Sequence, residues 1–263
     1  MDVLQHNREA WNRESSANGE WSIPVSEKII RSARNGTWDV ILTPLRSVPK
    51  SWFGDIQGKH ILCLASAGGQ QAPVLAAAGA RVVSYDLSDV QLEKDHMVAE
   101  RDNLDLHCVR GDMANLSKFS AGSFDLIFHA VSNVFVPDVG AVWNECYRVL
   151  KPGGDLLAGF MNPSFFLFDH DQSKRDDDIK VKYKLPYAEP DSLDSEGRRE
   201  LEKSGRALEF GHTLEAQLGG QLKAGFVISD LYEDYWTDEI PLNLFSPSSI
   251  ATRATKLNSN SGT

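Results

Sequence analysis

The residue types best suited to chemistry are concentrated in residues 59–86. There an apolar run meets the small-residue turn ASAGG at 65–69, an alanine-rich segment follows, and Val82 and Val83 lead to Asp86. Residues without bulky side chains let a ligand approach the backbone, and free N–H groups at a helix start attract a carboxylate or a phosphate. The Asp86 carboxylate can accept hydrogen bonds from both hydroxyls of a ribose, each worth about 1.5–3 kcal/mol. The pattern therefore predicts a strand–turn–helix–strand unit that holds a nucleoside.

The turn at 65–69 bears on which nucleoside is bound. A dinucleotide site is marked by the pattern G-x-G-x-x-G, whereas alanines stand here where its first two glycines would be. A nicotinamide-dependent oxidoreductase uses the same kind of unit and stays an alternative. The turn disfavours it, as does the later pair Asp112-Met113.

Further strand and helix patterns follow at regular intervals. A short apolar run at 106–109 ends in Gly111-Asp112-Met113, and another at 124–129 ends in His129. Residues 138–150 carry apolar side chains at helical spacing, and the motif KPGG at 151–154 precedes an apolar run to Phe160.

With these motifs in this order, residues 35–161 resemble the class I S-adenosylmethionine-dependent methyltransferases, especially the subgroup with the UbiE-like core. The resemblance implies an α/β fold, a Rossmann-like three-layer αβα sandwich. Its sheet has seven mostly parallel strands with an antiparallel closing strand. It also implies a methyltransferase that uses S-adenosyl-L-methionine. Two departures stand out: Cys63 occupies the position of the family's acidic residue, and Ala65 and Ala67 replace two glycines. In the family that carboxylate helps to orient the turn or the methionine ammonium, so another group must do so here.

The resemblance assigns cofactor-binding roles position by position. Ala65, Ser66, Ala67 and Gly68 match the turn beneath the methionine part of the cofactor, with Gln70 near the following helix start.

The other cofactor-binding positions follow the second and third strands. Asp86 matches the acceptor of the ribose hydroxyls, and Leu87 can pack on the adenine. Asp112 matches the carboxylate that accepts from the adenine amino group, with Met113 as its backbone neighbour, and Gln91 is a further candidate.

One residue is a candidate for acid–base chemistry. An activated methyl group mainly needs an aligned acceptor, and a general base is required only if that acceptor arrives protonated. His129 is expected at the carboxyl end of the fourth strand, beside the cofactor, where a neutral imidazole can take a proton. The alternative is that His129 caps the strand or lines the cofactor pocket without moving a proton. Asn133 and Phe135 follow and can line the acceptor site.

We expect residues 1–50 to form a helical cap, 51–161 and 212–257 the methyltransferase core, 162–211 an inserted lid, and 258–263 a disordered tail. In the lid, apolar residues from Ile179 to Leu185 alternate with lysines, which predicts a half-exposed strand, with 205–210 as its hairpin partner. Its lysine face can attract an anionic acceptor or simply protect a sheet edge. The acidic run at 176–178 is interpreted as a solvated loop, so no metal site is expected. Residues 212–223, 225–230 and 250–257 are predicted as a helix and two strands.

The composition bounds the remaining possibilities. A net charge of −10 over 263 residues argues against a nucleic-acid surface, which needs clustered cations. No apolar run approaches the ~18 residues of a membrane span, and three separated cysteines are typical of reduced thiols. We therefore expect a cytoplasmic enzyme acting on a small-molecule acceptor, with no membrane or nucleic-acid partner and with a homodimer as its candidate assembly. A non-catalytic protein that binds the cofactor is the second alternative.

Overall fold

Seven strands form one sheet in the order β3-β2-β1-β4-β5-β9-β8 in the computed structural model, which describes residues 2–168, 180–236 and 241–258. The first five strands pair in parallel, and β9 runs antiparallel to both of its neighbours. This confirms the predicted fold class. The strands are β1 (His60–Leu64), β2 (Arg81–Asp86), β3 (Leu106–Arg110), β4 (Phe124–His129), β5 (Leu150–Met161), β8 (Phe226–Asp234) and β9 (Ser249–Lys256).

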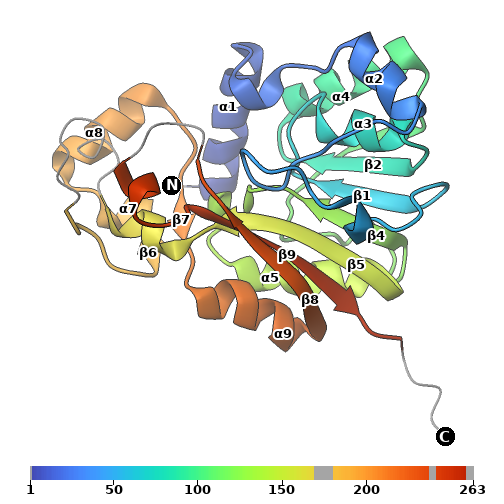
Figure 1. Ribbon diagram of the computed structural model, residues 1–263. Coiled ribbons are helices and arrows are strands. Elements are labelled where there is room, and N and C mark those ends of the chain that lie inside the picture. The colour runs from blue at the N-terminus through green and yellow to red at the C-terminus, as the bar shows by residue number, and fades with distance from the viewer. Residues whose placement is uncertain (1, 169–179, 237–240, 259–263) are drawn as a thin grey trace, which may run out of the picture.

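Helices cover both faces of the sheet (Figure 1). One layer contains α2 (Glu27–Arg34), α3 (Gln71–Ala77) and α4 (Asp89–Asp102), and the other contains α5 (Val139–Val149) and α9 (Gly220–Ala224). Short helical turns complete the chain: η1 (Glu20–Ser22), η2 (Lys50–Trp52), η3 (Asn133–Phe135), η4 (Pro163–Leu167), η5 (Glu215–Gly219) and η6 (Pro241–Leu244).

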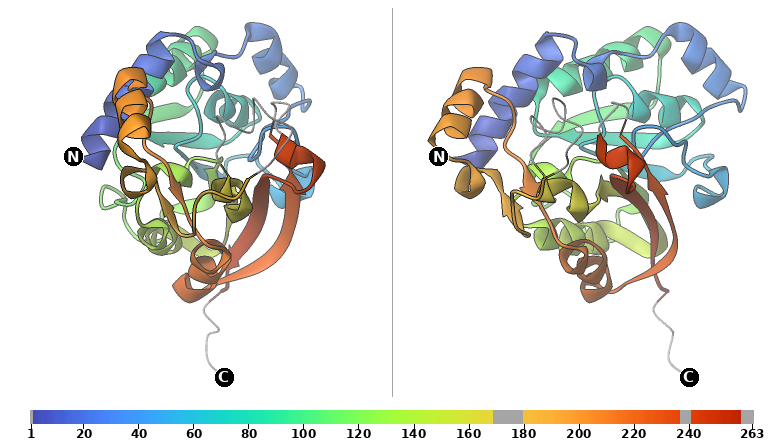
Figure 2. Two further views of the ribbon diagram at one scale, coloured as in Figure 1. Left: turned by 90° about the vertical axis from the view of Figure 1, so that its left-hand side faces the viewer. Right: turned by 60° about the vertical axis from the view of Figure 1, so that its left-hand side comes forward.

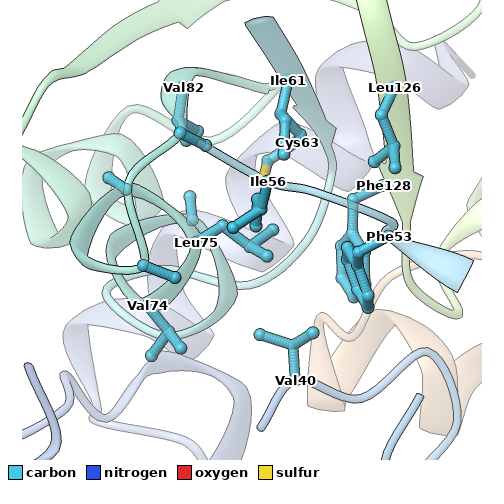
Figure 3. Close-up of a cluster of buried hydrophobic side chains, with 14 of the residues drawn as sticks. Val40, Phe53, Ile56, Ile61, Cys63, Val74, Leu75, Val82, Leu126 and Phe128 are labelled. Carbon is cyan, nitrogen blue, oxygen red and sulfur yellow. The ribbon is translucent and has the colours of Figure 1, made fainter. Parts of the chain in front are cut away.

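The central strand β1 shows why these strands are apolar along their length. Successive side chains point to opposite faces, so Ile61 and Cys63 join the core beneath α2, α3 and α4, while Leu62 and Leu64 join the core beneath α5. Figure 3 shows Cys63 in the first of these cores. A strand buried on both faces needs apolar residues on both, which the continuous run ILCL at 61–64 supplies.

The N-terminal helix and the segment after β5 lie together at one side of the sheet (Figure 2). Here α1 (Val3–Ser16) contacts the end of α8 (Ser195–Ser204), since the Arg13 guanidinium donates to the Gly205 carbonyl and His6 bonds to the Arg206 carbonyl. The remaining elements of this segment are the two-residue strands β6 (Tyr187–Ala188) and β7 (Phe210–Gly211), which pair antiparallel, and α7 (Glu189–Ser192).

The predicted strand in the lid is wrong. Of residues 180–185, only Val181 makes a bridge, a single one with Phe168. Tyr183 and Leu185 are partly buried against Phe166 and Tyr187, but Val181 is 69% exposed, so the alternating residues do not share one buried face. Among the described residues the segment has only this single bridge, and alternation without a longer paired strand does not make a sheet. The hairpin forms later instead, between β6 and β7. Ile179 and the acidic run at 176–178 lie outside the described residues.

Element boundaries also differ after residue 211. The predicted helix at 212–223 begins only at Glu215 and continues through α9 to Ala224, and the strand predicted at 225–230 extends to Asp234 as β8. Within the described residues, no helix is both long and apolar enough to cross a membrane.

Candidate functional site

A cavity of about 1010 Å³ opens where β1, β2, β3 and β4 end. Its walls come from the loops that follow these strands, from α1 and from the segment after β5. The carboxyl edge of a parallel α/β sheet is the usual place for a ligand, because the loops there diverge around the strand order reversal.

Eight of the eleven predicted cofactor-binding residues line this cavity. They are Ala65, Ser66, Ala67, Asp86, Leu87, Gln91, Asp112 and Met113. Gly68, Gln70 and His129 are not among the lining residues.

The turn after β1 has a backbone conformation that normally selects glycine. Ala65, Ala67 and Gly69 have φ angles of 46°, 71° and 74°, all in the left-handed region. An L-residue with a Cβ atom pays about 1–2 kcal/mol there, so the two alanines make the turn strained. Strain at such a position persists only when the surroundings enforce it. The Ser66 hydroxyl in the same turn is buried, and the described residues offer it no partner besides the neighbouring Cys63 thiol.

Two carboxylates follow the neighbouring strands β2 and β3. Asp86 accepts the backbone N–H of Ser88 at 2.8 Å, and Asp112 accepts that of Ala114 at 2.9 Å. The N–H of Gly111 donates to the Asp86 carbonyl, which ties the two turns together. Burial raises the pKa of Asp86 to about 6, although the hydrogen bond from the Ser88 N–H favours the ionised carboxylate and partly offsets this rise. The pair therefore presents carboxylate oxygens to one end of the cavity.

Gly68 and Gln70 serve the packing of the turn. A Cβ atom on Gly68 would lie 2.7 Å from the Gln91 carbonyl oxygen and 2.9 Å from its Cα, so only glycine fits beside that backbone. The Gln70 amide donates to the carbonyls of Glu20 and Ile23, which fastens the N-terminal segment over the turn.

His129 is fully buried on the α5 side of the sheet. Its Nδ1 lies 2.8 Å from the Leu64 carbonyl, its ring meets Trp143 edge-on, and its Nε2 has no partner among the described residues. Burial lowers the pKa of His129 to about 4, so the ring is neutral and Nδ1–H donates to Leu64. This geometry favours the alternative in which His129 caps the strand without moving a proton.

The residue that sequence reasoning missed is Asp95, on α4. It is fully buried and accepts the Gly69 N–H and the Ser84 hydroxyl, each at 2.6 Å. Burial raises the pKa of Asp95 to about 7. A signal existed in the sequence, because Asp95 stands on the helical stripe of Leu92 and Val98, and a carboxylate at a core-facing position requires polar partners.

The opposite end of the cavity is lined by aromatic side chains. They come from α1, from η3, from the segment after β5 and from the end of β8: Trp11, Phe135, Phe165, Phe166, Phe168, Tyr183, Tyr187 and Trp236. Several are in mutual ring contact, such as Phe166 stacked on Tyr187 at 5.5 Å. Of the residues that the sequence suggested for an acceptor, Phe135 lines the cavity and Asn133 does not. Lys180, Lys182 and Lys184 do not line it either.

Charged groups stand beside this aromatic end. Glu189 is engaged, since its carboxylate accepts from the Arg206 guanidinium and from the Glu209 N–H. The Glu209 side chain lines the cavity. Burial, reinforced by the nearby Glu189, raises the pKa of Glu209 to about 7, and Arg206 opposes this shift. A carboxylate with that pKa can accept a proton near neutral pH.

Comparisons with known proteins agree on the family. A family model described as "Methyltransferase domain" matches residues 62–158. The chain is 48% identical over 232 residues to the "Uncharacterized methyltransferase YbaJ" of Bacillus subtilis (strain 168). The aligned stretch covers 88% of this chain and 91% of that protein. It is 30% identical to the "Ubiquinone biosynthesis O-methyltransferase" of Nitrosococcus oceani, over 48% of this chain and 55% of the relative.

Solved structures share the fold. An S-adenosylmethionine-dependent methyltransferase from Mesorhizobium loti superposes with a TM-score of 0.62 at 18% identity, covering 78% of this chain and 94% of that one.

Proposed function

We propose that this chain, which belongs to the class I S-adenosylmethionine-dependent methyltransferases, methylates a small molecule held in the aromatic end of its cavity. The observation that carries the proposal is one cavity with two different ends. A strained small-residue turn and two carboxylates stand at one end, and aromatic rings with Glu209 stand at the other.

The first end suits S-adenosylmethionine. In this proposal Asp86 accepts from the ribose hydroxyls and Asp112 from the adenine amino group, while Leu87 and Met113 supply apolar contacts; all four line the cavity. Ala65, Ser66 and Ala67 follow the end of β1, where the methionine part would sit, and the described residues offer the buried Ser66 hydroxyl no partner apart from Cys63. Bound there, the cofactor supplies a methyl group already activated by its positive sulfur.

The second end suits an acceptor with an apolar, flat body. Aromatic walls bury such a body without requiring polar partners from it. With α1 and the segment after β5 around it, the acceptor is held away from bulk water, and holding it in a fixed orientation supplies much of the rate enhancement, on the order of 7–11 kcal/mol.

Glu209 is the group we assign to proton removal in place of His129. If the acceptor's nucleophile is a hydroxyl or an amine, the proton that it loses moves to a Glu209 carboxylate oxygen as the methyl bond forms. Glu209 faces the cavity and has a pKa near 7, whereas His129 is buried away from it and has a pKa near 4.

A screen of hydroxylated and amino-substituted aromatic compounds, read out as S-adenosylhomocysteine formation, tests this function. Turnover with at least one compound is expected, and it should rise with pH through about 7 as Glu209 ionises. Glu209→Gln should lose most of the turnover while it keeps its affinity for S-adenosylhomocysteine. Turnover that is undiminished in Glu209→Gln would exclude the proposed proton acceptor. No turnover across a broad panel, with cofactor affinity intact, would favour the non-catalytic alternative.

A further inference from the structure

The turn Ala65–Gly69 has the most unusual backbone of the described chain, and its shape is held from two sides. Of the four positive-φ residues other than glycine, two lie in it, Ala65 and Ala67. Such a turn keeps its shape only if hydrogen bonds and packing enforce it.

The outer side of the turn is held by the N-terminal segment. The Gly68 N–H donates to the Trp21 carbonyl at 3.3 Å, and the Gly69 carbonyl accepts from the Val25 N–H at 2.8 Å. Pro24 lies so close that a Cβ atom on Gly69 would be 2.9 Å from its Cα. These are backbone contacts and packing, without a charged group.

The inner side is held by one carboxylate. Asp95 reaches from α4 beneath the turn, where it accepts the Gly69 N–H and the Ser84 hydroxyl at 2.6 Å each. Ser84 lies beside Cys63 in the register of β1 and β2, so both side chains point to the same face of the sheet. A bond to an ionised group is shorter and stronger than one between neutral groups.

Asp95 does not line the cavity, so it has no direct contact with a ligand there. Its two hydrogen bonds instead connect Ser84 of β2 with Gly69, the last residue of the turn whose first three residues line the cavity. Both anchor points lie close in sequence to residues that line the cavity: Ser84 directly precedes Tyr85 and Asp86, and Gly69 stands two residues after Ala67.

We infer that Asp95 is a positioning residue for the cofactor, which holds the strained turn 65–69 and the end of β2 in the relative arrangement that binds the methionine and ribose parts. The inference rests on the proposed cofactor site. Asp95, a residue of α4, thereby orients the turn, whereas β1 has the Cys63 thiol at the position where the family has its acidic residue.

The test is calorimetric titration of the full chain with S-adenosylhomocysteine, with the melting temperature of each variant measured in parallel. Asp95→Ala should weaken binding about tenfold to a hundredfold, the loss expected for hydrogen bonds to a charged group. Asp95→Asn should recover part of that loss, because an amide oxygen still accepts the Gly69 N–H but carries no charge. Glu93→Ala, an exposed acidic position on the same helix, is the matched control and should bind like the wild type.

Ser84→Ala keeps the test decisive if Asp95→Ala does not fold. It removes the hydroxyl that orients the carboxylate and should weaken binding several-fold, with little loss of packing. Equal affinity of the wild type and a folded Asp95→Ala, or of the wild type and Ser84→Ala, would overturn the inference. A lower melting temperature with unchanged affinity would do so too, since it would show a structural role alone. Failure of the wild type itself to bind S-adenosylhomocysteine would instead refute the proposed cofactor site.

Discussion

Asp86 is the residue on which the nucleoside interpretation most depends. Its carboxylate stands at the end of β2, lines the cavity and is bonded to the Ser88 N–H. Asp86→Ala should weaken S-adenosylhomocysteine binding by about tenfold to a hundredfold, since about 1.4 kcal/mol corresponds to tenfold. Glu93→Ala, at an exposed acidic position of α4, is the control. Unchanged affinity in Asp86→Ala would remove this residue from the site.

The pKa of Asp86 gives a pH dependence whose sign is fixed. Only the ionised carboxylate accepts from both ribose hydroxyls, and its pKa is raised to about 6. Wild-type affinity should therefore fall as the pH drops through about 6 and level off above it. In Asp86→Asn this step should be absent, so the ratio of the two affinities should shrink toward acid pH. A constant ratio between pH 5 and 8 would contradict the assignment.

Ala67 tests the strain in the turn. Its φ of 71° destabilises the folded state by about 1–2 kcal/mol relative to an unstrained residue. A glycine relieves this strain, but it also makes the unfolded chain more flexible, which offsets part of the gain. Ala67→Gly should therefore stabilise the protein by up to about 1 kcal/mol in urea unfolding. Ala72→Gly, in the regular helix α3, should destabilise it by about 1 kcal/mol or more. Equal destabilisation by both changes would show that the turn stores no strain.

At the scale of elements, α1 is fastened across the cavity by one buried side chain. Asn7 donates to the carbonyls of Phe135 and Leu208 and accepts the Leu208 N–H. Asn7→Ala should leave these groups unpaired and destabilise the protein by about 1–3 kcal/mol. The exposed Gln5→Ala on the same helix should change the free energy of unfolding little. An equal effect of the two substitutions would contradict the bridging role.

The elements also show where sequence patterns predict structure well. In β1 and β4 the apolar run is long enough to be buried on both faces, so the strand follows from composition, whereas its place in the sheet followed from the resemblance to the family. From Ile179 to Leu185 the same two-residue period is present, but Val181 is exposed, and within the part of the chain that the structure describes its pairing is a single bridge to Phe168. Period alone does not report whether a partner strand lies alongside, and that depends on the rest of the chain.

The candidate site, like the secondary structure, could be predicted from the sequence only in part. Asp86 and Asp112 follow apolar runs in the sequence, so the ends of adjacent parallel strands bring them together. Asp95 and Glu209 belong to a helix and to an irregular segment, and no local pattern states that either approaches the turn or the aromatic rings. His129 was placed correctly at the end of β4, but the face to which it points depends on the register of the strand.

At the scale of the whole molecule, the fold separates two tasks. The sheet, through the ends of β1, β2 and β3, forms the end of the cavity that suits the cofactor. The segments outside it, α1 and the stretch after β5, form the end that suits an acceptor. Because the second end is built from segments that carry few motifs, the family can be recognised while the acceptor stays a proposal.

The central claim is that the end of the cavity at Asp86 and Asp112 binds the adenosine part of S-adenosylmethionine. Calorimetric titration of the wild-type chain with S-adenosylhomocysteine tests it most directly, with NAD as the parallel ligand. The account predicts micromolar binding of S-adenosylhomocysteine at one site per chain and no heat of binding with NAD. Binding of NAD, or of neither ligand, would contradict it.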